Sequence, residues 1–433
     1  MADDVEAGKN PAVETLIEYL TIRHEIDHYR AFISTPLGIF LDQAHIIITE
    51  YFNPLVSLAS KSGPLRIPRP VVAYLDALQP AYEDGDDNSL NNSLFVLHVR
   101  VREMRMIYRF LQGGSMIEVL SRGDHFAGFL SAIKFWSDLA FPNHSFADVG
   151  QSPQSELAAF PPVALGFLEI LEGLARASEY AVLVSSFPQY YQALKQHMHF
   201  GEYAVAIDRA TAMLEPLCDN MHTYILSLRS ILDLALYGPF IPLFPRRSTP
   251  CSWVELHPGL RFEAILAKLP TVGPLKRAAD YSAWVQSICD AMVPKWMTPM
   301  AIAPSLRDAQ RFGMSRLSQK IEDDRLSAAR MRIQHPHAIP LYPVYRPGSS
   351  TSELVERLYP PLLIGTDGFA SGTLPNDAIP EVVTVAAVIS ARHETLYVKE
   401  CTDTKRLVDA CAFGQVKDAA LRHLIESQTG IAL

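Results

Sequence analysis

The chain has 433 residues, of which 48% are hydrophobic and 20% are charged. This composition is that of a globular protein with a large core, and it excludes a mainly disordered chain. The formal net charge of -9 argues against a nucleic-acid-binding protein. No basic stripe with interleaved aromatic residues is long enough to follow a phosphate backbone.

Features that report on location favour the cytoplasm. The first residues are acidic and lack the cationic and apolar pattern of a secretion signal. The longest apolar runs, such as residues 226–244, contain charged residues and prolines, so we expect no membrane span. The five cysteines are odd in number and show no paired spacing, which is typical of reduced thiols: Cys218, Cys251, Cys289, Cys401 and Cys411.

The first predicted element is a helix that begins at Pro11 and ends near Ser34. Asn10 is a suitable N-cap, and a helix tolerates proline best in its first turn. Thr35 and Pro36 predict the cap and first residue of a second helix. Six residues of the first helix recur near helical spacing and define one inward face: Val13, Leu16, Ile17, Leu20, His24 and His28.

Residues 24–28 read His-Glu-Ile-Asp-His, which is the HExxH pattern of zinc hydrolases. Residues four apart on a helix lie one turn apart on the same face, so His24 and His28 can bind one metal ion. Glu25 lies on the flank of that face, where its carboxylate can accept a proton from a water molecule in an open coordination position. The pattern predicts His24 and His28 as metal ligands and Glu25 as a general base.

Further helices are predicted through the first half of the chain, where the alternation typical of strands is scarce. Apolar residues recur at helical spacing in residues 94–111, 126–139, 162–183, 190–198, 203–213 and 221–236. The segment 162–183 contains the sequence Glu172-Gly173-Leu174-Ala175. A glycine inside a helix costs about 1 kcal/mol relative to alanine, so Gly173 indicates a packing or functional requirement.

Together, HEIDH at 24–28 and EGLA at 172–175 resemble the gluzincin class of HExxH zinc metallopeptidases. In that class a glutamate on a later helix completes the metal site, so the resemblance implies Glu172 as third ligand. It also implies a Zn²⁺ cofactor, a peptide or protein substrate, and a helical, zincin-like catalytic half. Gly173 and Ala175 would let this helix approach the HExxH helix closely. Glu179, two turns beyond Glu172, could orient a ligating histidine.

A zinc peptidase also needs a group that stabilises the oxyanion formed at the scissile carbonyl. The sequence offers candidates by residue type alone, and their spacing favours none of them. These candidates are His199, Tyr203, His222 and Tyr224.

The composition changes near residue 240, where we place a boundary between two regions. Residues 1–240 form the predicted helical metallohydrolase domain, and residues 241–433 form a proline-rich connector with a smaller, mostly helical C-terminal region. Frequent prolines from 238 to 274 indicate a connector that wraps over the surface. Helices are predicted at 276–292, 305–331 and 407–425, whereas residues 382–389 fit either a helix or a strand. The predicted fold class is mainly α.

Two other functions use the same residues. Glu25-x-x-His28 also fits half of a di-iron carboxylate site, but such a site needs a second copy of the pattern. The nearest copies, at residues 42–45 and 219–222, have aspartate in place of glutamate. Alternatively, the chain is a noncatalytic helical interaction protein in which HEIDH belongs to the core. The metal content distinguishes the three functions: one zinc for the hydrolase, two irons for the di-iron protein and no metal for the noncatalytic protein.

Overall fold

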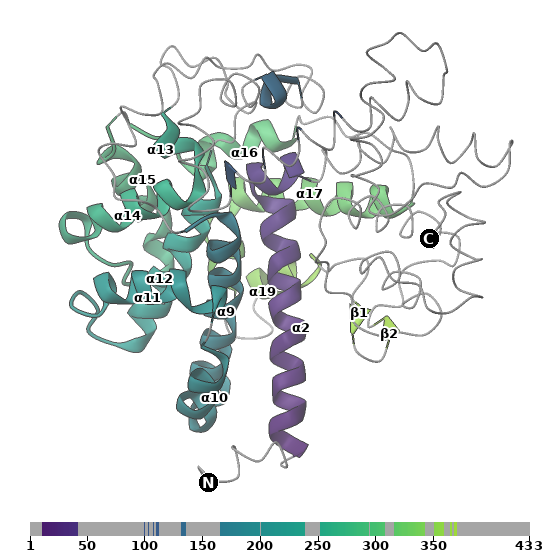
Figure 1. The fold of residues 1–433 in the computed structure, drawn as a ribbon, viewed down its shortest axis with the longest axis vertical. Coiled ribbons are helices and arrows are strands. Elements are labelled where there is room, and N and C mark those ends of the chain that lie inside the picture. The colour runs from purple at the N-terminus through teal and green to yellow at the C-terminus, as the bar shows by residue number, and fades with distance from the viewer. Residues whose placement is uncertain are drawn as a thin grey trace, which may run out of the picture. The chain divides into compact units, whose positions relative to one another are not determined.

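A computed structural model of the chain is mainly helical, which confirms the predicted fold class (Figure 1). Helices make up most of the residues that it describes. The segments at 382–389 and 407–425, and most of those at 94–111 and 126–139, lie outside them. The described residues are 11–41, 99, 103, 107, 110–111, 131–135, 165–199, 201–238, 252–293, 295–307, 316–342, 350–358, 364–365 and 368–369.

The chain divides into two compact units. The first consists of residues 1–40, 108–310 and 323–359, and it contains the candidate site. The second consists of residues 41–107, 311–322 and 360–433. Within the second unit, β1 (Ile364–Gly365) and β2 (Gly368–Phe369) form a short antiparallel pair.

The structure contains the helices predicted at 162–183, 190–198, 203–213 and 221–236, and it adds several short helices and one longer helix in stretches predicted to be irregular. The principal helices of the first unit begin with α2 (Pro11–Ser34), α9 (Phe167–Ser186), α10 (Tyr191–Met198), α11 (Glu202–Leu214) and α12 (Met221–Leu236). They continue with α13 (Trp253–Leu256), α14 (Pro258–Val272), α15 (Tyr281–Asp290), α16 (Pro299–Arg307), α18 (Ala338–Leu341) and α19 (Ser350–Glu356). The helix α17 (Arg316–Gln334) begins in the second unit and continues into the first, and the 3-10 turns η1 (Pro188–Tyr190) and η3 (Ala278–Asp280) precede α10 and α15.

The helix α2 has the predicted bounds, because the signals at its C-terminal end are local. It ends at Ser34, and residues 36–41 are again helical after a bend at Thr35. The Thr35 hydroxyl accepts a hydrogen bond from the Gly38 N–H at 3.1 Å, which is the expected N-cap interaction. Val13, Leu16 and His24 are buried on the inward face of α2.

The helix α9 lies at the centre of the first unit, with α2 along one side and α11 and α12 also packed against it (Figure 1). Every residue from Gly173 to Leu183 is buried, and this stretch includes the charged residues Arg176 and Glu179. A helix that is buried on all sides must pair its charged groups internally. The candidate site and its surrounding ion pairs provide that pairing.

Gly173 contributes to close helix packing, but its neighbours differ from those predicted. A Cβ atom placed on Gly173 would lie 3.1 Å from Ala206 Cβ in α11 and 3.5 Å from Leu232 Cδ2 in α12. The glycine therefore lets α11 and α12 approach α9, whereas the sequence analysis expected an approach of α2. A small residue indicates that some helix comes close without indicating which one.

The proline-rich stretch after residue 238 contains a buried helix. Pro258 begins α14 at a position where the missing N–H needs no partner, and the His257 side chain accepts a hydrogen bond from the Leu260 N–H at 3.3 Å. Most residues between Pro258 and Leu269 are buried, and α14 packs on α12. The expectation of a surface-wrapping connector is wrong for residues 258–272, and both sides of residue 240 contribute helices to the first unit.

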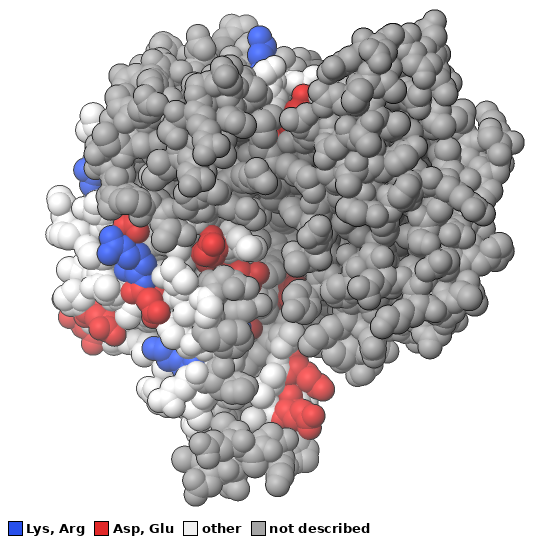
Figure 2. Space-filling view, in the orientation of Figure 1, with Lys and Arg blue, Asp and Glu red and all other residues white. Residues whose placement is uncertain are grey.

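The described surface shows no large basic patch in the view of Figure 2, where lysine and arginine side chains are scattered. None of the described helices combines the length and the apolarity that a membrane crossing requires.

We predict that Gly173→Leu destabilises the protein by roughly 1–3 kcal/mol, because the added atoms overpack the contact with Ala206 and Leu232. Ser185→Leu introduces the same side chain at an exposed position of α9 and should change stability by less than about 0.5 kcal/mol. Urea denaturation of both variants measures the difference. Equal stability of the two would contradict the packing assigned to Gly173.

Candidate metal centre

The pairing of α2 with α9 places both histidines of HEIDH against one carboxylate. Glu172 Oε2 lies 2.9 Å from His24 Nε2 and 3.3 Å from His28 Nε2. The two imidazole rings meet edge to face, with their centroids 4.4 Å apart. The three predicted ligands therefore converge, although Glu172 lies more than 140 residues from the histidines in the sequence.

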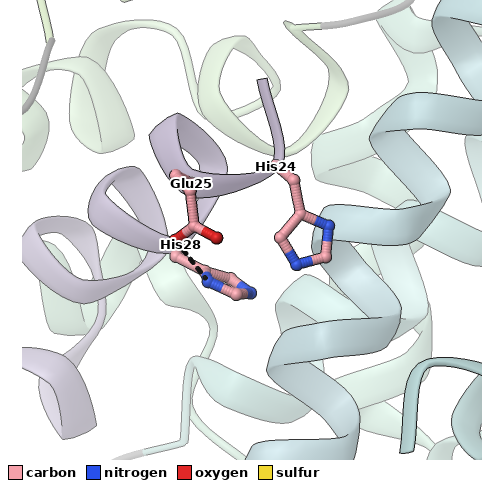
Figure 3. Close-up of side chains that lie close together, drawn as sticks. All are labelled: His24, Glu25 and His28. Carbon is pink, nitrogen blue, oxygen red and sulfur yellow. Dashed lines mark ion pairs between the residues drawn. The ribbon is translucent and has the colours of Figure 1, made fainter. Parts of the chain in front are cut away.

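Glu25 lies at the same site but makes a different contact. Its Oε2 atom is 3.5 Å from Nδ1 of His28 (Figure 3), whereas Glu172 faces the Nε2 atom of the same ring. One donor atom from each of His24, Glu25 and His28 falls within a group whose members lie within 4.8 Å of one another. The Glu25 side chain is 54% exposed, whereas that of Glu172 is only 13% exposed.

Two sets of three protein donors can be considered, one with Glu172 and one with Glu25, and among the described residues it is the set with Glu25 whose donor atoms all lie within 4.8 Å of one another. We favour the set with Glu172, because its oxygen faces Nε2 of both histidines and comes from a second helix. Glu25 faces the other ring nitrogen of His28 and is half exposed to solvent. Glu25 is therefore the less suited of the two carboxylates to complete the donor set.

Two of the donor distances suit a tetrahedral metal ion. Nitrogen and oxygen donors about 2.0–2.1 Å from zinc lie about 3.3 Å from each other in tetrahedral geometry. The distances from Glu172 Oε2 to the two Nε2 atoms are close to this value. The His28 Nε2 atom is also buried and, among the described residues, has no partner with hydrogen-bond geometry. Two imidazoles and one carboxylate would leave the fourth position open, as in catalytic zinc sites.

Residues behind the donors hold His24 in place. Glu179 Oε1 lies 3.1 Å from Nδ1 of His24, in the position predicted for an outer-sphere carboxylate. Arg176 donates a hydrogen bond to the other oxygen of Glu179. A carboxylate on the second ring nitrogen of a ligating histidine fixes both the orientation of the ring and its tautomer. The sequence analysis missed Arg176, whose spacing of three residues from Glu179 on one helix was the available signal.

The groups of the site shift one another's pKa values. Burial alone would lower the pKa of His28, but the carboxylates of Glu172 and Glu25 outweigh it and raise this pKa to about 10. Burial likewise opposes the rise in the pKa of His24, which Glu172 and Glu179 cause. For Glu172, burial would raise the pKa, but the two histidines lower it to about 2. In the metal-free protein, the site is thus a buried cluster of ion pairs.

The candidates for oxyanion stabilisation are placed elsewhere or not described. His199 lies between the Tyr180 hydroxyl at 3.0 Å and Asp208 at 2.7 Å, and the Tyr224 hydroxyl lies 2.6 Å from Thr211. His222 is exposed at the beginning of α12, and the side chain of Tyr203 is outside the described part of the chain. The structure therefore brings together the predicted metal ligands and the predicted base, but it does not add His199 or Tyr224 to them.

The second half of a di-iron site is not found among the described residues. A di-iron site would need His222 close to the buried His24 of α2. His222 is instead exposed in the first turn of α12. Residues 42–45 lie outside the described residues.

No protein-family model, curated protein or solved structure matches this chain. The assignment of a function therefore depends on the residues of the site.

We predict that zinc binding is strongly pH-dependent and releases protons. A raised pKa keeps His28 protonated in the metal-free protein at pH 7, whereas zinc binds only the neutral imidazole. Zinc affinity should therefore fall as the pH falls, by about tenfold or more per pH unit between pH 8 and 6. Calorimetric titration in buffers of different ionisation enthalpy measures the protons released. Zinc binding without proton release would contradict the ion pairs of His28.

Proposed function

We propose that the chain is a zinc-dependent hydrolase that cleaves peptide bonds, with zinc held by His24, His28 and Glu172. The observation that carries the proposal is the position of Glu172 Oε2, which lies within 3.3 Å of Nε2 in both histidines. Three protein donors would leave a fourth position open, and this, with the nearby, half-exposed Glu25, favours catalysis over a structural metal. The resemblance to gluzincins, carried by residues 24–28 and 172–175, supplies the choice of peptide substrates.

Each residue has a distinct role in this proposal. Zinc would polarise the scissile carbonyl and lower the pKa of a bound water. Glu25 takes the proton from the attacking water and transfers it to the leaving amine. In the metal-free protein, pairing with His28 lowers the pKa of Glu25 against the effect of burial, so its carboxylate is ionised at neutral pH and is able to accept a proton. Glu179 keeps His24 oriented, and Arg176 holds Glu179.

We further propose that the enzyme works in the cytoplasm. Cys218 and Cys289 are free thiols in the structure, and Cys289 is buried. Free thiols are typical of proteins in reducing compartments.

If Glu172 is the third ligand, Glu172→Ala should reduce zinc retention at least tenfold, because only two protein ligands would remain. Glu169→Ala is the matched control, since Glu169 lies on the same helix and has a structural contact of its own. Its Oε2 atom accepts a hydrogen bond from the Gly166 N–H at 2.8 Å, at the start of α9. Zinc is measured by mass spectrometry after dialysis against a weak chelator. Equal retention in the two variants would remove Glu172 from the site.

Replacement of the base should separate catalysis from metal binding. Glu25→Gln keeps the shape of the side chain but cannot accept a proton, so peptide cleavage should fall by about 10² or more with zinc content unchanged. Glu18→Gln makes the same substitution at an exposed position of α2 and should retain full activity. Turnover of a mixed peptide library and zinc content are measured together. Undiminished cleavage by Glu25→Gln, or none by zinc-loaded wild type, would favour the noncatalytic reading.

A further inference from the structure

Asp27, inside the HEIDH sequence, is buried on the flank of α2 opposite to Glu25. Its side chain is surrounded by polar groups from its own helix and from two others. One carboxylate oxygen accepts a hydrogen bond from the Ser178 hydroxyl and lies 3.4 Å from Arg229 Nη1. The other oxygen accepts a hydrogen bond from Arg30 Nη1 at 3.3 Å. Asp27 is only 5% exposed, so these contacts replace its hydration.

Arg229 of α12 connects Asp27 to the backbone of two more helices. Its Nη1 atom donates a hydrogen bond to the Leu174 carbonyl of α9 at 3.1 Å and also contacts Ser178. Its Nε atom donates to the Pro340 carbonyl of α18 at 2.6 Å. One buried guanidinium thus contacts α2, α9 and α18 from α12. Planar guanidinium groups form directional bonds, so this arrangement restricts both sliding and rotation of the helices.

The cluster is adjacent to a metal donor on α2 and to the carboxylate on α9 that orients His24. Asp27 precedes His28 in α2, and Ser178 precedes Glu179 in α9. Rotating α2 by about 10° would move an atom at its outer radius of about 5–6 Å by about 1 Å. Metal–ligand distances are held to about 0.2 Å, so such a rotation would break the site. Apolar contacts alone are nondirectional and would not prevent it.

We propose that Asp27, held by Ser178 and Arg229, is a positioning residue that sets the rotation of α2 against α9 and so the spacing of the zinc donors. The proposal rests on the metal site proposed above. Buried ion pairs commonly serve the stability of a fold. Here the cluster also fixes the positions of the metal donors. Asp27 and Ser178 are not among the metal donors, so they act through the placement of the helices.

The test compares two buried serines. Ser178→Ala removes one contact of Asp27 while keeping every charge of the cluster. Ser227→Ala is the matched control: Ser227 is buried in α12, and its hydroxyl accepts a hydrogen bond from the Leu275 N–H at 2.9 Å. Zinc affinity is measured by competition with a chelator, and the geometry of the site is followed by the visible absorption spectrum of the cobalt-substituted protein. Asp27→Asn provides a stronger change, and the serine pair decides the result if that variant does not fold.

Ser178→Ala should weaken zinc binding about tenfold and alter the cobalt spectrum, as expected when the support of a metal ligand is lost. Ser227→Ala should bind zinc within about twofold of wild type and leave the spectrum unchanged, at a similar loss of thermal stability. Equal zinc affinity and equal spectra in the two variants would overturn the positioning role alone. Failure of the wild type to bind zinc would overturn the metal site as well, whereas zinc binding without hydrolysis would overturn only the catalytic proposal.

Discussion

The first unit depends on the pairing of charged groups between α2 and α9. Two imidazoles of α2 face the carboxylates of Glu172 and Glu179 in a contact from which water is largely excluded. Removing an ion from water costs several kcal/mol, and close partners offset this cost only while their geometry is kept. The contact therefore prefers one arrangement of the two helices strongly over neighbouring ones. The same property makes it suitable for holding a metal ion.

The remaining helices support that arrangement from the other faces of α9. Because Gly173 has no side chain, α11 and α12 pack closely against α9. The helix α12 also carries Arg229, which contacts Asp27. The donors are therefore carried by packed helices and not by loops, which favours a site held in fixed geometry. Glu25 is the most exposed of these residues, with 54% of its side chain accessible.

The sequence predicted features that arise from local interactions. Helix periodicity and the Thr35-Pro36 signal were sufficient for the bounds of α2, and similar periodicity was sufficient for α10, α11 and α12. The HEIDH and EGLA patterns were sufficient to nominate three residues that meet in space. Long-range contacts were harder to infer. Gly173 indicated a close approach but not its partner, and prolines after residue 238 did not reveal the buried helix α14.

The Asp27 cluster shows a second limit of sequence analysis. Asp27, Ser178 and Arg229 lie on three separate helices, and charged residues on helices are usually solvated. Their burial follows from the packing of α9 between its neighbours, which periodicity alone does not specify. Only the arrangement of the helices shows that the residue beside a predicted ligand is held by a guanidinium more than 200 residues away in the sequence.

The most direct test of the central claim is anomalous X-ray scattering from crystals of the full chain, measured on either side of the zinc absorption edge. We predict one anomalous peak, within about 2.0–2.2 Å of Nε2 in His24 and His28 and of a carboxylate oxygen of Glu172. A peak bound by other residues, or density for His24, Glu172 and His28 as ion pairs in crystals grown with excess zinc, would contradict the account.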